Sequence, residues 1–270
     1  MCRMIGAILA RPMCLLKYLV EDECSLMAQA EKGKQSDGWG IGYYKQGRLF
    51  VFKSPRPVYE EKELFRKVGE RAISKIVIAH VRKASNPRKL PREKLIALEN
   101  TQPFYYENYL FVHNGTILYP DEVLNVLEEY RFLVKGINDS EVYFALLIKG
   151  LVEERGDFIE AIKFAKETLW SVFKEVTNKR YEIPYSSLNT IFSDGKKLYA
   201  FVHYLSGSDL KSICYRDSPY FGMVYYVGEN FLIVASEKTN REHKWRLLED
   251  NSILVARIHD NKVEYNIERI

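Results

Sequence analysis

The amino-acid sequence predicts an α+β fold in which two β-sheets are sandwiched by helices. Segments with strand patterns and tight-turn dipeptides occupy both ends of the chain, and two long amphipathic helical segments lie between them. No internal repeat and no linker rich in Gly, Pro or Ser divides the 270 residues. We therefore expect residues 1–270 to form a single domain.

Apolar runs and turn signals place the elements of the first half. The sequence predicts strands over 3–10, 75–82 and 108–117, because these runs are apolar and bounded by breakers. A hairpin with Gln46-Gly47 as its tight turn is expected within 36–55. Amphipathic spacing predicts helices over 14–32, before the breaker Gly33, and over 59–70.

The second half begins with helices and ends with strands. Pro120 is tolerated in a first helical turn, which favours a helix over 121–130. Asp139 or Ser140 is expected to cap a helix over 140–155, and Asp157 a helix over 157–176. Strand patterns then fill 188–204, 223–238 and 252–270, with hairpin turns at Asp194-Gly195 and Asp260-Asn261.

Composition narrows the class of protein. The net charge of +4 is small, and basic residues concentrate in one segment, the predicted loop 82–94, RKASNPRKLPREK. Such a composition is typical of a solvated basic loop, and RNA binding is the less favoured interpretation. The four cysteines, at 2, 14, 24 and 214, show no zinc-site or disulfide spacing, so we expect free thiols in a reducing compartment. A soluble, cytoplasmic protein that binds neither nucleic acid nor membrane is predicted.

Cys2 directly follows the initiating methionine, and three explanations are open. The position is chance, it belongs to a secretory signal, or removal of Met1 exposes a thiol beside a free α-amine. The apolar run from Met4 to Ala10 is interrupted by Arg11 and Pro12, which makes it a poor signal peptide. The choice between the other two depends on the remaining motifs.

Three further segments carry candidate chemistry. Arg82 ends a predicted buried strand, where a guanidinium suits a carboxylate, although a structural ion pair would also satisfy it. Asn114 and Gly115 offer a side-chain amide and an accessible backbone N–H, as an oxyanion hole requires, yet Asn-Gly is also a hairpin-turn signal. Asp139 stands at a helix start, where its role is either a ligand or only a cap.

In combination these segments resemble the class II glutamine amidotransferases, which are N-terminal nucleophile (Ntn) hydrolases. The resemblance rests on MCRMIGAI, SDGWGIGYY, AHVRKAS, LENTQPF, FVHNGTI and NDSE in the family's order, and extends to VASEKTNREHKWRLLEDNSILVARI, as in short stand-alone members that act on γ-glutamyl amides. It implies a four-layer αββα sandwich of two mainly antiparallel sheets, and an amidohydrolase without cofactor or metal.

The resemblance also implies roles for individual residues. Met1 is removed, and Cys2 attacks the side-chain amide of glutamine. Asn114 and Gly115 hold the tetrahedral oxyanion. Arg82 binds the substrate α-carboxylate with help from Ser85, and Asp139 binds the α-ammonium. Trp39 and its neighbouring glycines shape the site.

The proposed chemistry of Cys2 is also consistent with the acid–base properties of its own two groups, apart from the family resemblance. An α-amine titrates near pH 8 and a thiol near 8.5, so the amine can take the thiol proton and no histidine base is required. A cysteine–histidine–acid triad using His80 or His113 is the weaker alternative, because strand position alone does not supply its geometry. The five histidines show no metal-ligand spacing.

Two departures from the family pattern concern the substrate. Relatives often carry histidine at the position of Gln102, and an aromatic residue or glutamine at that of Lys83. We expect no residues for a synthase domain, which leaves a glutaminase subunit that supplies ammonia to a partner synthase, or a free-standing hydrolase of another γ-glutamyl amide, as in glutathione degradation or ergothioneine biosynthesis. A non-catalytic polyanion- or RNA-binding protein is the alternative of a different class.

Overall fold

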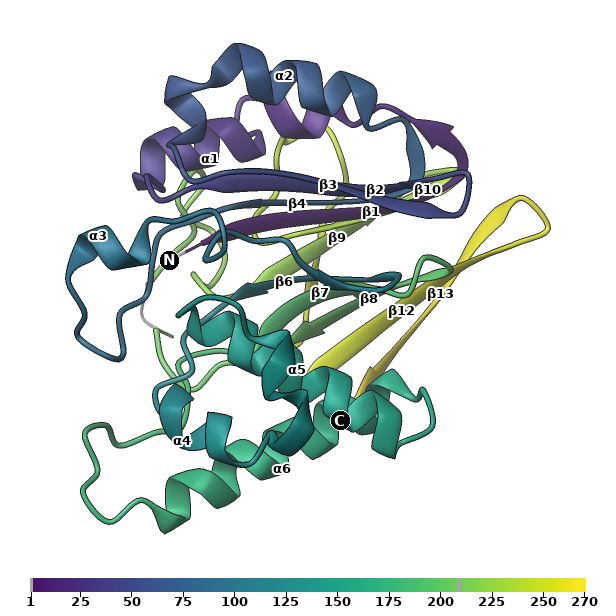
Figure 1. Ribbon diagram of the computed structural model, residues 1–270. Coiled ribbons are helices and arrows are strands. Elements are labelled where there is room, and N and C mark those ends of the chain that lie inside the picture. Colours follow the sequence, from purple (N-terminus) through teal and green to yellow (C-terminus); the bar gives the residue numbers. More distant parts are fainter. Residues whose placement is uncertain (1, 208–209) are drawn as a thin grey trace.

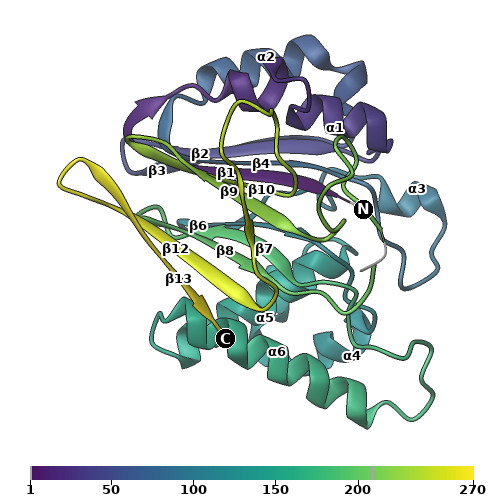
Figure 2. The same ribbon diagram turned by 180° about the vertical axis from the view of Figure 1, so that it is seen from behind.

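The computed structural model describes residues 2–207 and 210–270. Two antiparallel sheets pack face to face, and helices cover the outer face of each, so the elements form four layers (Figure 1). Figure 2 shows the same layers from behind, with the C-terminus beside α6. The predicted α+β sandwich of two antiparallel sheets is confirmed.

The two sheets contain seven and six strands. In the order of their pairing, the first sheet consists of β11 (Arg246–Leu248), β9 (Met223–Val227), β10 (Phe231–Ala235), β1 (Arg3–Met13), β4 (Ser74–Val81), β2 (Trp39–Lys45) and β3 (Arg48–Ser54). The second consists of β13 (Lys262–Arg269), β12 (Ser252–His259), β8 (Lys197–Val202), β7 (Asn189–Ser193), β6 (Tyr109–Asn114) and β5 (Phe104–Tyr106).

The helices fall into two outer layers. Over the first sheet lie η1 (Lys17–Glu21), α1 (Leu26–Gly33), η2 (Val58–Glu60) and α2 (Lys62–Arg71). The second sheet is covered by α4 (Pro120–Asn125), η3 (Glu128–Leu133), α5 (Asp139–Glu153) and α6 (Phe158–Glu175). The short α3 (Arg92–Leu95) lies in the connection between the sheets. None of the helices in the described ranges has the apolar length that a membrane crossing requires.

Side-chain alternation along β1 links two of the three buried cores. Ile5 and Leu9 pack with residues of α1 and α2, whereas Met4 and Ile8 pack between the sheets. A third core joins the second sheet to α5 and α6. Because β1 is central and both of its faces are buried, its first residues are held firmly although they are close to the chain terminus.

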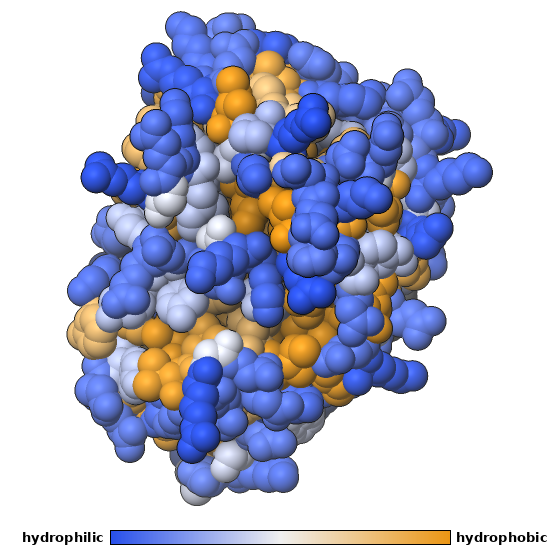
Figure 3. All heavy atoms as spheres, turned by 90° about the vertical axis from the view of Figure 1, so that its right-hand side faces the viewer, coloured by the Kyte–Doolittle hydropathy of each residue, from blue (hydrophilic) through white to orange (hydrophobic). Residues whose placement is uncertain are grey.

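Two of the three predicted tight turns are confirmed, whereas Asp194-Gly195 lies in the connection 194–196 between β7 and β8 with positive φ at Gly195 alone. Gln46 and Gly47 connect β2 to β3 with φ of 52° and 74°, and Asp260 and Asn261 connect β12 to β13 with φ of 47° and 57°. Positive φ at both central residues is the signature of the hairpin turn that matches strand twist. Figure 3 shows the end of the molecule at which the β12–β13 turn projects, where blue polar side chains are interspersed with orange apolar patches.

The single helix predicted over 14–32 is wrong. Residues Lys17–Glu21 form a π-helical turn, and α1 begins only at Leu26 with Ser25 as its N-cap. The break has a tertiary cause, because Asp22 accepts hydrogen bonds from Asn240 and Thr239, and the backbone N–H of Cys24 donates to Thr239 O at 3.0 Å. Hydrogen bonds to the distant segment 239–240 therefore replace those that would continue the helix.

The expectation of four free thiols is also wrong. Cys24 and Cys214 form a disulfide, whereas Cys2 and Cys14 are free. The two bonded residues are 190 positions apart, and the fold brings their Cα atoms to 6.1 Å. Cysteine spacing cannot reveal such a pair, because only the packed chain determines which Cβ atoms face each other.

Candidate active site

Cys2 is buried at the start of β1. Its side chain and backbone are 6% exposed, and the strand that follows is paired with β10 on one side and β4 on the other. The thiol Sγ donates to Lys83 O at 3.5 Å, just past the end of β4. A residue next to a chain terminus is therefore held among the central strands of the first sheet.

The surroundings of Cys2 keep its thiol protonated. Burial raises the pKa of the Cys2 thiol, a hydrogen bond with the Lys83 backbone and the positive charge of Arg82 oppose the rise, and the negative charge of Asp139 adds to it. A buried thiol of raised pKa is a poor nucleophile until a base takes its proton. The same charges show that Arg82 and Asp139 lie near the sulfur.

Arg82 lies directly after β4 with its guanidinium buried. Nη1 donates to Leu95 O at 2.8 Å and to Asp37 O at 3.2 Å. Within residues 2–207 and 210–270, no carboxylate forms an ion pair with it, so the structural ion pair considered from sequence is not observed. Burial lowers the pKa of Arg82, while Cys2 and Asp139 act to raise it. A buried guanidinium without a carboxylate partner in the described ranges has the chemistry to bind an anionic ligand.

Asp139 is the first residue of α5, but it is not the cap. Asn138 caps the helix by accepting the N–H of Ser140 at 2.8 Å, so the expected Asp139 or Ser140 cap is wrong. The Asp139 carboxylate instead accepts from Ser85 Oγ at 2.5 Å and from the N–H of Ile117 at 2.8 Å. Burial raises its pKa, and these hydrogen bonds together with Arg82 oppose the rise.

Ser85 contacts the candidate site by a hydrogen bond to Asp139. Its single O–H is donated to the Asp139 carboxylate, so in this arrangement it cannot also donate to a substrate carboxylate. Its oxygen lone pairs remain able to accept from an ammonium group. In this arrangement Ser85 orients the Asp139 carboxylate.

Asn114 ends β6 with an unpartnered amide. The residue is fully buried, and neither its Nδ2 nor its Oδ1 has a hydrogen-bond partner in the part of the chain that the structure describes. Leaving a buried amide unpaired costs about 1–3 kcal/mol, which a fold tolerates where a ligand will supply the partner. Asn114 is thus the clearest orphaned donor in the candidate site.

Gly115 is not part of a type I′ turn. That turn requires positive φ at both central residues, and neither Asn114 nor Gly115 has it. Glycine is required here by packing, because a Cβ at residue 115 would lie 2.0 Å from Ser187 O. The hairpin-turn alternative for Asn-Gly is therefore excluded.

The two histidines near the site are core residues. His113 is hydrogen-bonded on both ring nitrogens, to Ser140 Oγ and to Ser187 O, each at 2.9 Å. Burial lowers the pKa of His113 to about 4, and burial with the charge of Arg82 lowers that of His80 to about 3. Neither ring forms a hydrogen bond with Cys2 Sγ within the described ranges, so the geometry gives no support to a histidine triad.

These histidines predict a pH dependence of stability. Their pKa in the unfolded chain is about 6.5, so the unfolded state binds more protons and stability falls as the pH drops from about 6.5 to 4. We expect each histidine to contribute a loss of about 3 kcal/mol in the free energy of unfolding over that window. Urea unfolding at pH 7 and pH 4.5 measures it. His80→Leu is expected to flatten the slope, and equal slopes for His80→Leu and wild type would contradict the assignment.

Two positions that depart from the family pattern have clear structural roles. Gln102 accepts the N–H of His113 at 2.6 Å and donates to its carbonyl at 3.1 Å, which braces the strand one residue before Asn114. Lys83 contributes its backbone carbonyl to the Cys2 thiol. Trp39, expected to shape the site, packs against Phe65 and donates to Glu61 under α2, so it supports β2 from the helix side.

Sequence reasoning missed Asp37 and Arg3. Asp37 is buried and accepts the N–H of Ala84 at 2.7 Å while pairing with Arg92, which fixes the backbone after Arg82. Arg3 is fully buried and donates from Nη1 to Cys2 O at 3.0 Å. A charged residue at the first position of a buried strand was the available signal for Arg3.

The basic loop 82–94 is tied to the fold. Arg88 bonds Asp121 at 2.7 Å and Ile137 O at 2.6 Å, and Arg92 pairs with Asp37. Arginines already engaged within the protein are less available to an external polyanion. This arrangement favours a loop that orders the site over a nucleic-acid surface.

One cluster has the composition of a metal site. Cys24, Cys214 and Glu237 place three potential ligand atoms within 4.8 Å of one another. The two sulfurs are joined to each other, so neither is a thiolate ligand, and the ammonium of Lys32 lies 3.7 Å from Cys214 Sγ. The residues present therefore do not fit a cation in this state.

Comparison with known proteins identifies related sequences and folds. A family model described as glutamine amidotransferases class-II matches residues 13–265. An uncharacterized protein of Methanocaldococcus jannaschii is 28% identical over 250 residues, which cover 84% of this chain and 63% of that protein. The probable glutamine amidotransferase DUG3 of Saccharomyces cerevisiae is 26% identical over 82% of this chain and 69% of its own length. The chain thus spans less than two thirds of the Methanocaldococcus relative.

Solved structures share the fold. A glutamine aminotransferase class-II domain protein from Silicibacter pomeroyi matches with a TM-score of 0.63 and 17% identity, covering 98% of both chains. The glutamine phosphoribosylpyrophosphate amidotransferase of B. subtilis matches with a TM-score of 0.62 and 16% identity over 98% of this chain and 49% of that one. The four-layer sandwich expected from the motifs is confirmed by these likenesses.

Proposed function

Because the chain belongs to the class II glutamine amidotransferases, we propose that it hydrolyses the γ-amide of glutamine to glutamate and ammonia, with Cys2 as nucleophile. Removal of Met1 would leave Cys2 with a free α-amine, whose pKa of about 8 makes it a base near neutral pH. The buried thiol of raised pKa needs such a base. No cofactor takes part in this chemistry.

The amine and the oxyanion donors divide the work of the reaction. The α-amine takes the thiol proton, and the thiolate adds to the γ-carboxamide carbon. Asn114 Nδ2 and the N–H of Gly115 hold the oxyanion that forms, and the amine returns the proton to the leaving ammonia. Water, activated by the same amine, then hydrolyses the thioester and releases glutamate.

Two charged groups hold the amino-acid end of the substrate. Arg82, which has no ion-pair partner among the described residues, binds the α-carboxylate. Asp139, oriented by Ser85 and the N–H of Ile117, binds the α-ammonium. A bound ammonium would also stabilise the ionised form of Asp139 against the burial that raises its pKa.

The observation that carries the proposal is the unpartnered amide of Asn114. It is fully buried, at the end of a strand, with both polar atoms free within the described part of the chain. A purely structural asparagine would be hydrogen-bonded at this depth. An oxyanion that forms only during the reaction explains why the donor is left open in the folded protein.

A partner synthase that uses the ammonia is part of the proposal. Exposed apolar side chains at Leu98, Tyr105 and Phe132 line a pocket of about 570 Å³ that also includes Glu141 on α5, two residues after Asp139. Exposed apolar clusters of this kind mark protein interaction sites. The cluster supports a subunit that works with a partner.

The experiment compares two substrates with the isolated protein. We expect ammonia release from glutamine that is absent in Cys2→Ala, and little cleavage of γ-glutamyl dipeptides. Both rates are followed by glutamate formation, with exposed Cys14→Ala as the matched control. Strong dipeptide cleavage without glutamine turnover would replace the glutaminase proposal by the free-standing γ-glutamyl hydrolase. Loss of activity in the Cys14 variant alone would move the nucleophile away from Cys2.

A further inference from the structure

Arg3 is the buried charge closest in sequence to the proposed nucleophile. Its guanidinium is fully buried, and Nη1 donates to the carbonyl of Cys2 at 3.0 Å. Nε lies 3.9 Å from Glu237 Oε2, and the guanidinium carbon lies 4.1 Å from the centre of the Tyr220 ring. Neither Nε nor Nη2 has a hydrogen-bond partner among the described residues, so the Cys2 carbonyl is its main polar contact.

The partners of Arg3 come from one loop and one strand end. Glu237 follows β10, and its buried carboxylate accepts the N–H groups of Ile213 at 2.8 Å, Cys214 at 2.5 Å and Tyr215 at 3.3 Å. Tyr220 belongs, like these three residues, to the connection between β8 and β9. We name residues 210–222 of this connection the covering loop. Glu237 therefore joins Arg3 to the covering loop.

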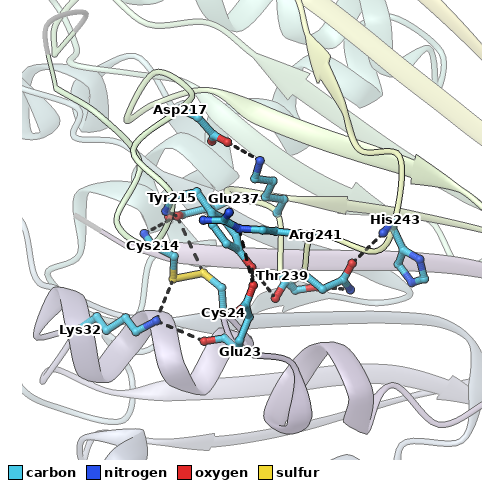
Figure 4. A network of polar contacts seen from close by, with 12 residues as sticks. Glu23, Cys24, Lys32, Cys214, Tyr215, Asp217, Glu237, Thr239, Arg241 and His243 are labelled. Atoms are coloured by element: carbon cyan, nitrogen blue, oxygen red, sulfur yellow. Dashed lines mark hydrogen bonds and ion pairs between the residues drawn. A yellow bond between two sulfur atoms is a disulfide. The ribbon is translucent and has the colours of Figure 1, made fainter.

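The covering loop is fastened to the helix layer by a covalent bond. Figure 4 shows Cys214 of the loop joined to Cys24, one residue before the N-cap of α1, with Glu237 beside both sulfurs. Tyr215 Oη donates to Glu23 at 2.5 Å, and Lys238 pairs with Asp217. These contacts hold the part of the loop that follows Cys214.

Resting on the proposed function of Cys2, we propose that Arg3 is a positioning residue that fixes the Cys2 backbone, and that the Cys24–Cys214 disulfide supports it through the covering loop. The α-amine and the thiol of Cys2 both project from its Cα, which is bonded to the carbonyl carbon. A hydrogen bond that holds the carbonyl therefore limits the movement of the backbone from which the base and the thiol project. Removal of Met1 makes this restraint more important, because no preceding residue then holds Cys2.

The positioning role of Arg3 is expected to affect kcat and to leave substrate binding unchanged. Among the described residues, no hydrogen bond or ion pair joins Arg82 or Asp139 to Arg3, so substrate affinity should be unaffected by changes behind Cys2. Misplacing a reacting group by about 1 Å can cost about 10²-fold in rate. We therefore expect Tyr220→Leu, and the Cys24→Ser/Cys214→Ser pair, to lower kcat about 10- to 100-fold with KM for glutamine nearly unchanged.

Two sets of variants test the proposal. Tyr220→Leu removes the ring under Arg3 without leaving a buried charge unpaired, and Tyr226→Leu, whose ring stacks on His243 instead, is the matched control. Arg3→Met and Arg3→Lys form the second set, in which lysine should restore part of the kcat that methionine loses. Thermal unfolding of every variant identifies any that fail to fold. Raised KM with unchanged kcat, or wild-type kinetics in Tyr220→Leu, would overturn the proposal.

A readout without substrate distinguishes this inference from the proposed function. Alkylation of Cys2 by iodoacetamide, followed by peptide mass mapping, should be faster in Tyr220→Leu than in wild type, because a loosened Cys2 becomes exposed. Faster alkylation in a protein whose wild type does not turn over glutamine would support the positioning role and refute the glutaminase. Alkylation equal to that of wild type and of Tyr226→Leu would refute the positioning role, whatever the activity.

Discussion

Replacing Cys2 by alanine is expected to lower glutamine turnover by about 10⁴-fold or more, since only binding and the oxyanion donors would remain. The side chain is buried and small, so the fold should tolerate the change with a loss near that of other modest core truncations. Steady-state ammonia release and thermal unfolding of the same preparation separate the two effects. Exposed Cys14→Ala provides the matched thiol control.

A covalent probe makes this expectation specific. A glutamine analogue carrying a diazoketone should add one adduct to wild type, on a chain that has lost Met1, and none to Cys2→Ala, as read by intact mass. Retention of Met1 in an active protein would rule out the α-amine of Cys2 as the base. An adduct on Cys14, or on the Cys2→Ala variant, would show that the pocket lies elsewhere.

Replacing Asn114 by alanine is expected to lower kcat by about 10²- to 10³-fold, the usual cost of losing one oxyanion donor. KM should change little, because the amide meets the oxyanion of the transition state rather than the ground-state substrate. Kinetics with glutamine measure both constants. The amide has no partner among the described residues, so its removal should not expose a new unpaired group.

The Asn114 prediction has a stability control. If the amide were structural, Asn114→Ala would lower the free energy of unfolding and kcat together, whereas a catalytic donor lowers kcat alone. Exposed Asn178→Ala should change neither. Unchanged kcat in a folded Asn114→Ala protein would remove Asn114 from the oxyanion hole and, with it, the main support for the proposed function.

Sequence patterns predicted the fold well where they act over short range. The Gln46-Gly47 and Asp260-Asn261 turns form as expected, because positive φ at two adjacent residues is a local preference. The same reasoning is misleading at Asn114-Gly115, where neither φ is positive. There glycine is required by the close approach of Ser187 O, two residues before β7, which no local pattern can show.

The break in the helix predicted over 14–32 is also caused by contacts with a distant segment of the chain. The apolar spacing over 14–32 satisfies a helix, yet Asp22 bonds Thr239 and Asn240, more than 200 positions later in the chain. Tertiary hydrogen bonds outweighed a helix preference of a few tenths of a kcal/mol per residue. The disulfide of Cys24, which lies in the same break, was missed for the same reason.

The sequence by itself determined the fold class, the short turns and the candidate residues Cys2, Arg82, Asn114, Gly115 and Asp139, because these follow from periodicity, turn chemistry and motifs. Only the tertiary structure decided which polar groups were left unpaired. It showed Asn138 as the cap of α5 and Asn114 as an open donor. It also placed Arg3 behind Cys2. A polar group acquires its hydrogen-bond partner when strands and loops distant in sequence pack together. The burial and the hydrogen bonding of polar groups are therefore properties of the packed chain.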